Sequence, residues 1–194
     1  PSVTALPDTF AVDLLVRAFA DDPLFTHFAD TPALRRALFA HQVRAGMRML
    51  YRSGPACEAV ALWEEPGGPG ISIRQGLLDL RAAVGLLRAL GVRRTADLAA
   101  FNSWATELRQ RLVGGQHWHL VLLASDPAHR GRGHAWSLVH PVLDEADRTG
   151  VPAYLETHNP ANVARYLGYG FELVAEHTVP GTAVIQRCML RRPG

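Results

Sequence analysis

Residues 120–135, LVLLASDPAHRGRGHA, combine a buried strand with a candidate phosphate-binding turn. The apolar run 120–123 predicts the strand, which ends at Asp126-Pro127 because proline cannot donate to a β-ladder. Two glycines and two arginines in 130–133 then lead into a helical pattern. Free backbone N–H groups, the positive end of a helix dipole and arginine side chains all attract a pyrophosphate. The stretch therefore predicts a strand, a phosphate-binding turn and a helix, in that order.

Two common phosphate-binding motifs do not fit this turn. A P-loop requires GxxxxGK[ST], and the chain contains no lysine. A Rossmann fingerprint requires glycine or alanine at the position that Trp136 occupies. The pattern [QR]-x-x-G-x-[GA] does fit, with Arg130, Gly133 and Ala135 at its defined positions. This pattern resembles the acetyl-CoA motif of the GNAT superfamily of N-acetyltransferases.

Further segments resemble one bacterial branch of that superfamily, the puromycin-type antibiotic N-acetyltransferases. They are AFADDP (18–23), EAVALWEEP (58–66) and GVPAYLETHNPANVARYLGYGFELVAE (150–176). The match is close from about 117 onward, patchy before 66 and nearly absent from 67 to 116. The resemblance implies a layered α/β fold with a mixed, mostly antiparallel twisted sheet flanked by helices. It also implies a splayed pair of parallel strands, the fourth and fifth in the family's order.

Composition favours one domain over 1–194, because 194 residues with 48% hydrophobic content can bury a sizeable core. Two helical patterns between predicted strands indicate a helical insertion at about 70–114. The formal charge of +2 comes from scattered arginines and requires no nucleic-acid partner. No apolar run is long enough to span a membrane, and the start shows no signal pattern. A cytoplasmic protein without a membrane partner is expected, as a monomer or a homodimer. Cys57 and Cys188 show no metal spacing and are expected to be free thiols.

Hydrophobic periodicity and turn residues predict the other elements. Helices are expected from Asp8 to about 20, from Thr31 to about 50, and at 74–90, 96–112, 133–148 and 162–168. Strands are expected at 2–6, 48–52, 59–63, 153–157, 171–178 and 183–190. Pro141 lies inside the helix 133–148 and is expected to kink or weaken one turn. The strands on either side of this helix should be parallel, and the last two strands should pair antiparallel.

Acetyl transfer from a thioester to an amine requires a CoA site, a polarised carbonyl, a neutral amine and a proton for the departing thiolate. The resemblance implies that the strand backbone holds the pantetheine arm and that the turn holds the pyrophosphate. The predicted acetyl-CoA-binding residues are Leu122, Leu123, Ala124, Ser125, Arg130, Gly131, Arg132, Gly133, His134, Ala135, Asn162 and Tyr166. A backbone N–H at a bulge in this strand is expected to polarise the thioester oxygen. No metal is expected.

Tyr166 is the predicted general acid. It follows Asn162 by four positions, so both lie on one helix face. In the resembled family, the tyrosine of this N-x-x-x-Y arrangement protonates the CoA thiolate, a role that suits a phenol. A core tyrosine with a satisfied hydroxyl is the alternative, and Tyr169 is the less favoured candidate.

The general base stays open at the level of sequence. His117 and His119 alternate on the predicted pantetheine strand and point to one face, where His119 could take the amine proton near neutral pH. Arylalkylamine acetyltransferases also place histidine on this strand. Glu156 on the neighbouring strand is a second candidate for this catalytic role, and ordinary strand packing explains both histidines equally well. The predicted acceptor-binding residues are Asp22, Phe25, Phe28, Trp63 and His117, with Glu64 and Asp21 as further carboxylates that could hold a cationic substrate.

The sequence thus predicts transfer of an acetyl group from acetyl-CoA to the primary amine of a small molecule, such as an antibiotic or an amino-nucleoside. Direct attack in a ternary complex is expected, because neither cysteine lies in the motif. Antibiotic resistance is the role that the resemblance implies. Two alternatives stay open: acetylation of a protein N-terminus or lysine, and a non-catalytic acyl-CoA-binding sensor.

Overall fold

A computed structural model of the chain describes residues 8–44, 49–53, 58–67 and 73–194. The strand predicted at 2–6 and Cys57 lie outside the described residues. Among the described residues, no helix combines the length and the apolar composition needed to cross a bilayer.

Three helices precede the sheet: α1 (Asp8–Ala18), α2 (Pro23–Phe28) and α3 (Pro32–Arg44). The Asp22 carboxylate accepts hydrogen bonds from the backbone N–H groups of Leu24 and Phe25, and Pro23 opens α2. Asp22, directly before this proline, therefore caps a helix that the sequence analysis did not predict. The helix predicted to reach about residue 50 ends at Arg44, and Met49 already starts a strand.

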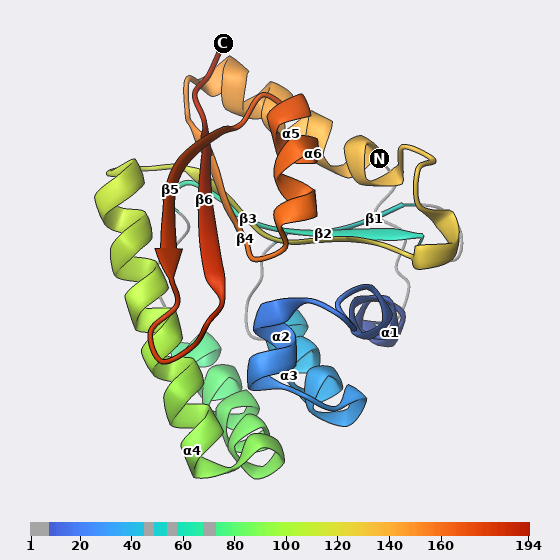
Figure 1. Cartoon of the computed structure of the whole chain (residues 1–194), viewed down its shortest axis with the longest axis vertical. Coiled ribbons are helices and arrows are strands. Elements are labelled where there is room, and N and C mark those ends of the chain that lie inside the picture. Colours follow the sequence, from blue (N-terminus) through green and yellow to red (C-terminus); the bar gives the residue numbers. More distant parts are fainter. Residues whose placement is uncertain (1–7, 45–48, 54–57, 68–72) are drawn as a thin grey trace.

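The described residues form one sheet of six strands, in the order β1-β2-β3-β4-β6-β5 (Figure 1). The strands are β1 (Met49–Ser53), β2 (Ala59–Glu64), β3 (Trp118–Ser125), β4 (Ala153–Thr157), β5 (Glu172–Thr178) and β6 (Ile185–Arg191). Of these described strands, only β3 and β4 pair in parallel, and the other neighbours pair antiparallel. The predicted mixed, mostly antiparallel sheet is confirmed.

The parallel pair separates part-way along its length. Pairing joins Trp118–Leu120 to Ala153–Leu155, although β3 continues to Ser125 and β4 to Thr157. At the same level, the register between β2 and β3 shifts, so that Val121 is an extra residue on β3. Such a bulge bends its strand and increases the local twist. The bulge and the separation together open a gap between the carboxyl ends of β3 and β4.

Helices cover both faces of the sheet (Figure 1). Helix α5 (His134–Thr149) packs on β1, β2 and β3 from one side, and α1 packs on β2 and β3 from the other. Helix α5 continues through Pro141, so this proline does not end it. The short helix α6 (Val163–Gly168) follows β4.

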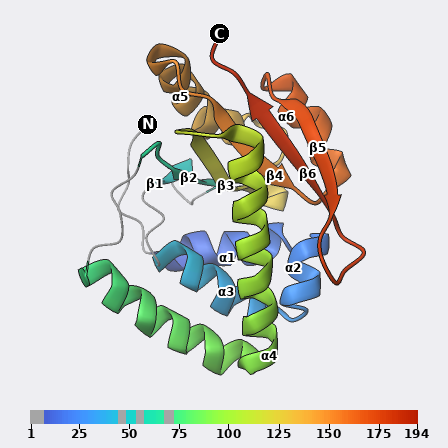
Figure 2. The same cartoon turned by 90° about the vertical axis from the view of Figure 1, so that its left-hand side faces the viewer.

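The two helices predicted between β2 and β3 form α4 (Ile73–Val113), which bends sharply at Gly91. Gly91 has a φ of 79°, a left-handed value that glycine adopts without strain. The second half of α4 lies across one face of the sheet at β4 and β6 (Figure 2). Leu98 packs among the N-terminal helices, whereas Leu108 packs against Tyr154 and Leu190. This half of α4 therefore connects the α1–α3 layer to β4 and β6.

Candidate active site

The turn before α5 has the geometry of an anion site. Gly131 and Gly133 both have a φ of 79°, and Gly133 occupies the cap position of α5. This conformation is strained for any residue with a Cβ, so the turn requires its glycines. The first N–H groups of a helix have no intrahelical partner and attract phosphate oxygens.

A cavity of about 440 Å³ lies at this turn and is called the loop cavity below. It brings together the predicted residues Leu123, Ala124, Ser125, Arg130, Gly131, Gly133, His134, Ala135 and Asn162, and adds Arg165 and Tyr169 from α6 and its end. Arg130 and Arg165 supply positive charge beside the helix N-terminus. These groups fit the pyrophosphate of acetyl-CoA. Arg132 is exposed and does not line this cavity.

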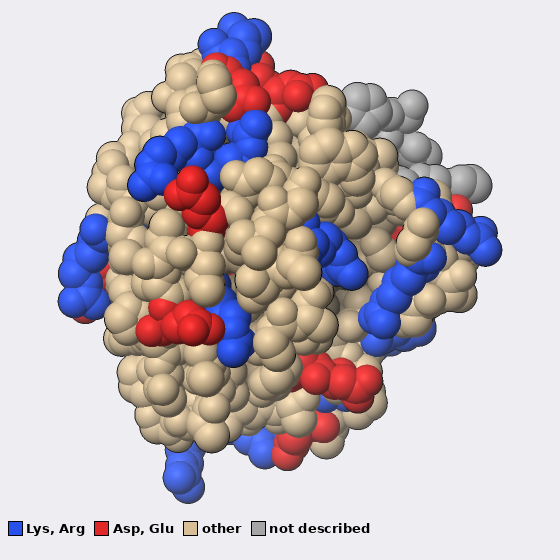
Figure 3. Space-filling view, turned by 45° about the horizontal axis from the view of Figure 1, so that its top comes forward, with Lys and Arg blue, Asp and Glu red and all other residues tan. Residues whose placement is uncertain are grey.

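Figure 3 shows the charged side chains on one face of the molecule. Arginine and carboxylate side chains are scattered there over a mostly uncharged surface. Among the residues that the structure describes, no group of three or more His, Cys, Asp or Glu side chains is placed to hold a metal ion.

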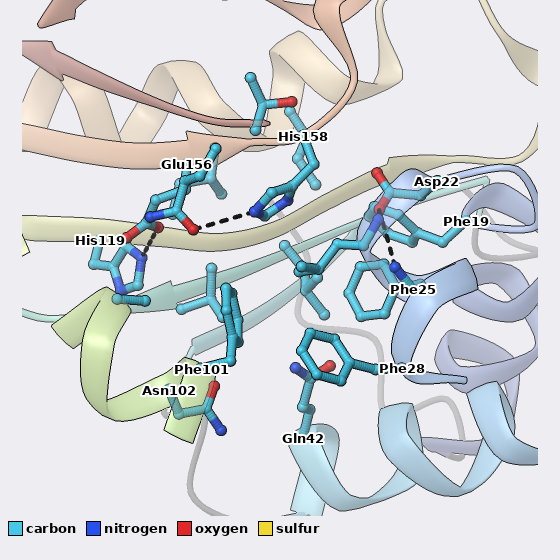
Figure 4. A pocket seen from close by; sticks show the side chains of 18 of the residues that line it. Phe19, Asp22, Phe25, Phe28, Gln42, Phe101, Asn102, His119, Glu156 and His158 are labelled. Atoms are coloured by element: carbon cyan, nitrogen blue, oxygen red, sulfur yellow. Dashed lines mark hydrogen bonds and ion pairs between the residues drawn. The ribbon is translucent and has the colours of Figure 1, made fainter. Parts of the chain in front are cut away.

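A second cavity, of about 400 Å³, lies between the N-terminal helices, α4 and the separated ends of β3 and β4. We call it the acceptor cavity. Its lining includes Phe19, Phe25, Phe28 and Phe101, and Phe28 and Phe101 meet with 5.4 Å between ring centroids (Figure 4). Helix α4 contributes one face, at Leu98, Phe101, Asn102, Ala105, Thr106 and Arg109. The predicted residues Asp22, Phe25 and Phe28 therefore do line a common cavity.

One end of the acceptor cavity is charged. Nδ1 of His119 lies 2.8 Å from Oε2 of Glu64, and Nε2 lies 2.8 Å from Oε2 of Glu156. Nη1 of Arg109 approaches the same ring, 2.8 Å from Nδ1. His119 is only 6% exposed, so these contacts are largely removed from water. The four side chains come from β2, α4, β3 and β4.

The electrostatics of this cluster are set by its carboxylates. Burial favours the neutral imidazole, but Glu156 and Glu64 outweigh it and raise the pKa of His119. Burial favours the neutral acid at Glu156, yet His119 and Arg109 outweigh it and lower the pKa of that carboxyl. The hydrogen bond from His119 is the main cause of the lowered pKa of Glu64. The cluster therefore holds ionised carboxylates around a histidine that favours its charged form.

This geometry argues against the predicted role of His119 as general base. As an imidazolium, His119 donates to both carboxylates and has no lone pair. As a neutral ring, it donates from Nε2 to Glu156 and accepts at Nδ1 from Arg109. Both ring nitrogens are engaged in either state, so the ring presents no free acceptor to an amine.

Two predicted acceptor-binding residues are placed elsewhere, and these predictions are wrong. Trp63 is fully buried and packs with Trp118 and residues of α5, on the face of the sheet away from the acceptor cavity. The sequence could not show which face of β2 Trp63 lies on. Both faces of β2 are covered, so its residues do not alternate between apolar and polar. His117 lies just before β3, where Nδ1 bonds the carbonyl oxygen of Gly115, and it lines neither cavity.

The two cavities meet. Phe19, Asp22, Leu123 and Asn162 line both of them. We call this shared boundary the junction. Tyr166, the predicted general acid, lines the acceptor cavity, and burial raises the pKa of its phenol, so that it stays protonated at neutral pH. Leu122 also lines the acceptor cavity.

The sequence analysis missed Arg109, Phe101, His158 and Gln186, all of which line the acceptor cavity. Arg109 and Phe101 lie in the segment that lacks the family resemblance, although their helical spacing with Leu98 does indicate a shared face. His158 and Gln186 are 28 residues apart in sequence and meet only through the sheet. No local pattern indicates their contact.

Comparisons with known proteins find similarities to acetyltransferases. Residues 80–171 match the model of the acetyltransferase (GNAT) family. An uncharacterized N-acetyltransferase of Schizosaccharomyces pombe is 27% identical over 175 residues, which cover 83% of this chain and 69% of the relative.

Two solved structures match along almost the whole chain. A Corynebacterium glutamicum structure, described as histone acetyltransferase HPA2 and related acetyltransferase, has a TM-score of 0.67 and 23% identity, over 99% of this chain and 95% of its own. Arylalkylamine N-acetyltransferase 2 of Aedes aegypti has a TM-score of 0.59 and 14% identity, over 98% and 97%. At these identities the two structures show the fold alone. Residues 80–171 thus resemble the acetyltransferase (GNAT) family, and the N-acetyltransferase relative supports an acetyl-CoA-dependent N-acetyltransferase.

Proposed function

We propose that this enzyme transfers the acetyl group of acetyl-CoA to the primary amine of a small molecule, by direct attack in a ternary complex. One observation carries the proposal: the loop cavity meets, at the junction, an acceptor cavity of about 400 Å³. This volume suits a small ligand rather than a long peptide. The second half of α4 forms one wall of the acceptor cavity.

The residues of the loop cavity are proposed to hold acetyl-CoA, which supplies an activated acetyl thioester. Arg130, Arg165 and the N–H groups at the start of α5 bind its phosphates. Beyond Leu120, β3 no longer pairs with β4, so backbone groups on that edge are available to a ligand. The bulge at Val121 supports a backbone N–H of this segment as the donor that polarises the thioester oxygen.

The acceptor cavity supports an amphipathic amine as substrate. Phenylalanine side chains suit an apolar or aromatic body. The cluster of Glu64, His119, Glu156 and Arg109 can bind a polar group of the acceptor by charge-assisted hydrogen bonds. Antibiotics and amino-nucleosides, the acceptors implied by the puromycin-type resemblance, belong to this class.

The test is release of free CoA from acetyl-CoA across amine antibiotics, aminoacyl nucleosides, arylalkylamines, polyamines and peptides. We expect turnover with one or more small amphipathic amines and a much lower kcat/KM with peptides. Peptides belong in the panel because the C. glutamicum structure is described as a histone acetyltransferase. Turnover with peptides alone would show that the substrate class is wrong. Binding of acetyl-CoA without turnover of any amine would favour the sensor alternative.

A further inference from the structure

His158 occupies a defined position in the acceptor cavity. It directly follows β4, and its Nε2 lies 3.2 Å from Oε1 of Gln186 on β6. Gln186 is fully buried, and its amide nitrogen faces Sγ of Cys188 at 3.9 Å. This orientation turns the amide oxygen toward His158. An amide oxygen only accepts, so Nε2 carries the hydrogen and Nδ1 of the neutral ring carries the lone pair.

That Nδ1 has no hydrogen-bond partner among the residues that the structure describes. His158 and Asp22 both line the acceptor cavity (Figure 4). Its ring therefore differs from that of His119, where both nitrogens are engaged. In the neutral form, His158 offers the cavity a free acceptor.

The surroundings of His158 also place it beside the reaction. Asp22 belongs to the junction, and its charge acts on both His158 and Tyr166. One Asp22 oxygen, Oδ1, already accepts from the α2 backbone. Asp22, His158 and Tyr166 thus all line the acceptor cavity, and Asp22 lies where it meets the loop cavity, from which an acetyl thioester would reach in.

We propose that His158 is the general base of this enzyme and that Asp22 holds the incoming amine beside it, an inference that rests on the proposed function. The amine nitrogen bonds to the acetyl carbon, and the carbon–sulfur bond breaks. One N–H proton passes to Nδ1 of His158, and the departing sulfur takes the phenol proton of Tyr166. Return of a proton from His158 to Tyr166 through water restores both residues.

The groups that face His158 leave it neutral near pH 7. Burial lowers the pKa of His158, and Arg187 on β6 acts in the same direction. Asp22, Gln186 and Glu156 on β4 act the other way, but the pKa remains below its ordinary value. Phe101 of α4 contacts the ring without adding charge. A neutral ring at physiological pH is the form that a general base requires.

The first test needs no acceptor. The imidazole signals of the whole enzyme are titrated by NMR, and His158→Gln and His119→Gln assign the two residues. We expect His158 to titrate below about 6.5 and His119 above it. An imidazole of His158 that stays protonated above pH 7 would overturn the base role and leave the proposed function standing.

The second test is kinetic and uses 2-phenylethylamine together with the best amine of the panel. At pH 7, His158→Gln should lower kcat by about 10²–10⁴-fold, with part of the activity recovered at pH 9, where more of the amine is free. The rise in melting temperature on adding acetyl-CoA should stay unchanged, which shows that the variant folds. The matched control is His177→Gln, on an exposed histidine of β5, which should keep wild-type turnover.

Gln186→Glu gives an independent readout. A carboxylate beside Nε2 favours the charged ring, so the acidic limb of the pH–kcat/KM profile should move to higher pH. An equal loss for His158→Gln at both pH values, or an unmoved acidic limb in Gln186→Glu, would refute the base role. A wild-type enzyme that acetylates no amine would instead remove the proposed function, and the base role with it.

Discussion

Nε2 of His119 lies 2.8 Å from Oε2 of Glu156 on the neighbouring strand, in a part of the cavity that is largely closed to water. His119 pairs in register with Tyr154, so Glu156 lies two residues further along β4, on the same face as Tyr154. Strand pairing therefore fixes this contact. The contact determines how the stability of the enzyme depends on pH.

The pKa of His119 is higher in the folded chain than its ordinary value. Its contribution to stability is therefore complete below about pH 6.5 and is lost as the pH rises through the folded-state pKa. Glu156→Gln removes the stronger partner, so the loss should begin at lower pH. We expect a destabilisation of about 1.5–3 kcal/mol near pH 6, becoming smaller toward pH 9, in urea unfolding at a series of pH values.

Glu145→Gln is the control for this series, because Glu145 is exposed and pairs with Arg148 rather than with a histidine. It should show no such pH dependence between pH 6 and 9. A constant difference between wild type and Glu156→Gln over that range would contradict the linkage to His119.

Replacement of His119 should reduce activity without changing its pH dependence. Because both ring nitrogens are engaged, His119→Gln should disturb Glu64 and Glu156 rather than remove a proton acceptor. The expected loss in kcat/KM is equal at pH 7 and pH 9, measured with the same amine. Recovery at pH 9 alone would restore His119 as the base.

Tyr166→Phe should lower kcat by about two orders of magnitude or more, because the buried phenol is the proposed proton donor to the thiolate. Acetyl-CoA binding should barely change, since the ring remains. Tyr154→Phe is the matched control: Tyr154 is also a buried tyrosine, but it lines neither cavity and should keep the wild-type kcat. Near-normal turnover of Tyr166→Phe, with chemistry rate-limiting, would assign the acid to another group.

Acetyl-CoA should stabilise the enzyme by about 2.7 kcal/mol at a hundredfold excess over Kd, seen as a raised melting temperature. Gly133→Val should abolish this gain. A Cβ at Gly133 meets no protein atom within 4 Å, so the cost in the free protein comes from the left-handed backbone, about 1–2 kcal/mol. Gly85→Ala within α4 should stabilise the free protein and leave the acetyl-CoA effect intact. A wild-type rise in melting temperature for Gly133→Val on adding acetyl-CoA would show that the phosphates do not bind at this turn.

The C-terminal end should be held through Asp147. Its carboxylate accepts two hydrogen bonds of 2.7 Å from Arg191 and one of 3.0 Å from the N–H of Gly194, and the Arg191 contact lowers its pKa to about 2. The stabilisation of the fold by the ionised Asp147 carboxylate is complete above about pH 3.8 and is lost as the pH falls toward 2. Asp147→Asn should cost about 1 kcal/mol or less at pH 7. Urea unfolding should show wild type and variant converging at low pH, and an unchanged gap would refute the assignment.

Much of the local structure was predictable from sequence. The apolar run of β3, the glycines before α5 and the i, i+4 spacing of Asn162 and Tyr166 each express a local rule of backbone or helix geometry. These features also carry the loop cavity and the candidate acid, because all the groups concerned lie within short stretches. Side-chain periodicity was sufficient to predict the two halves of α4 as helices, and Gly91 explains the bend between them.

Only the tertiary structure decided the rest. The position of β6 between β4 and β5, the bulge at Val121 and the burial of Trp63 under α5 depend on which strands and helices meet. The acceptor cavity draws on α2–α4, β2–β4, α6 and β6. Contacts with Glu64, Arg109 and Glu156 engage both ring nitrogens of His119. The contact with Gln186 engages one ring nitrogen of His158 and leaves the other free among the described residues. Hydrogen bonding and burial set the state of a titratable side chain, and both depend on residues far away in sequence, so the sequence could name candidate bases but could not choose among them.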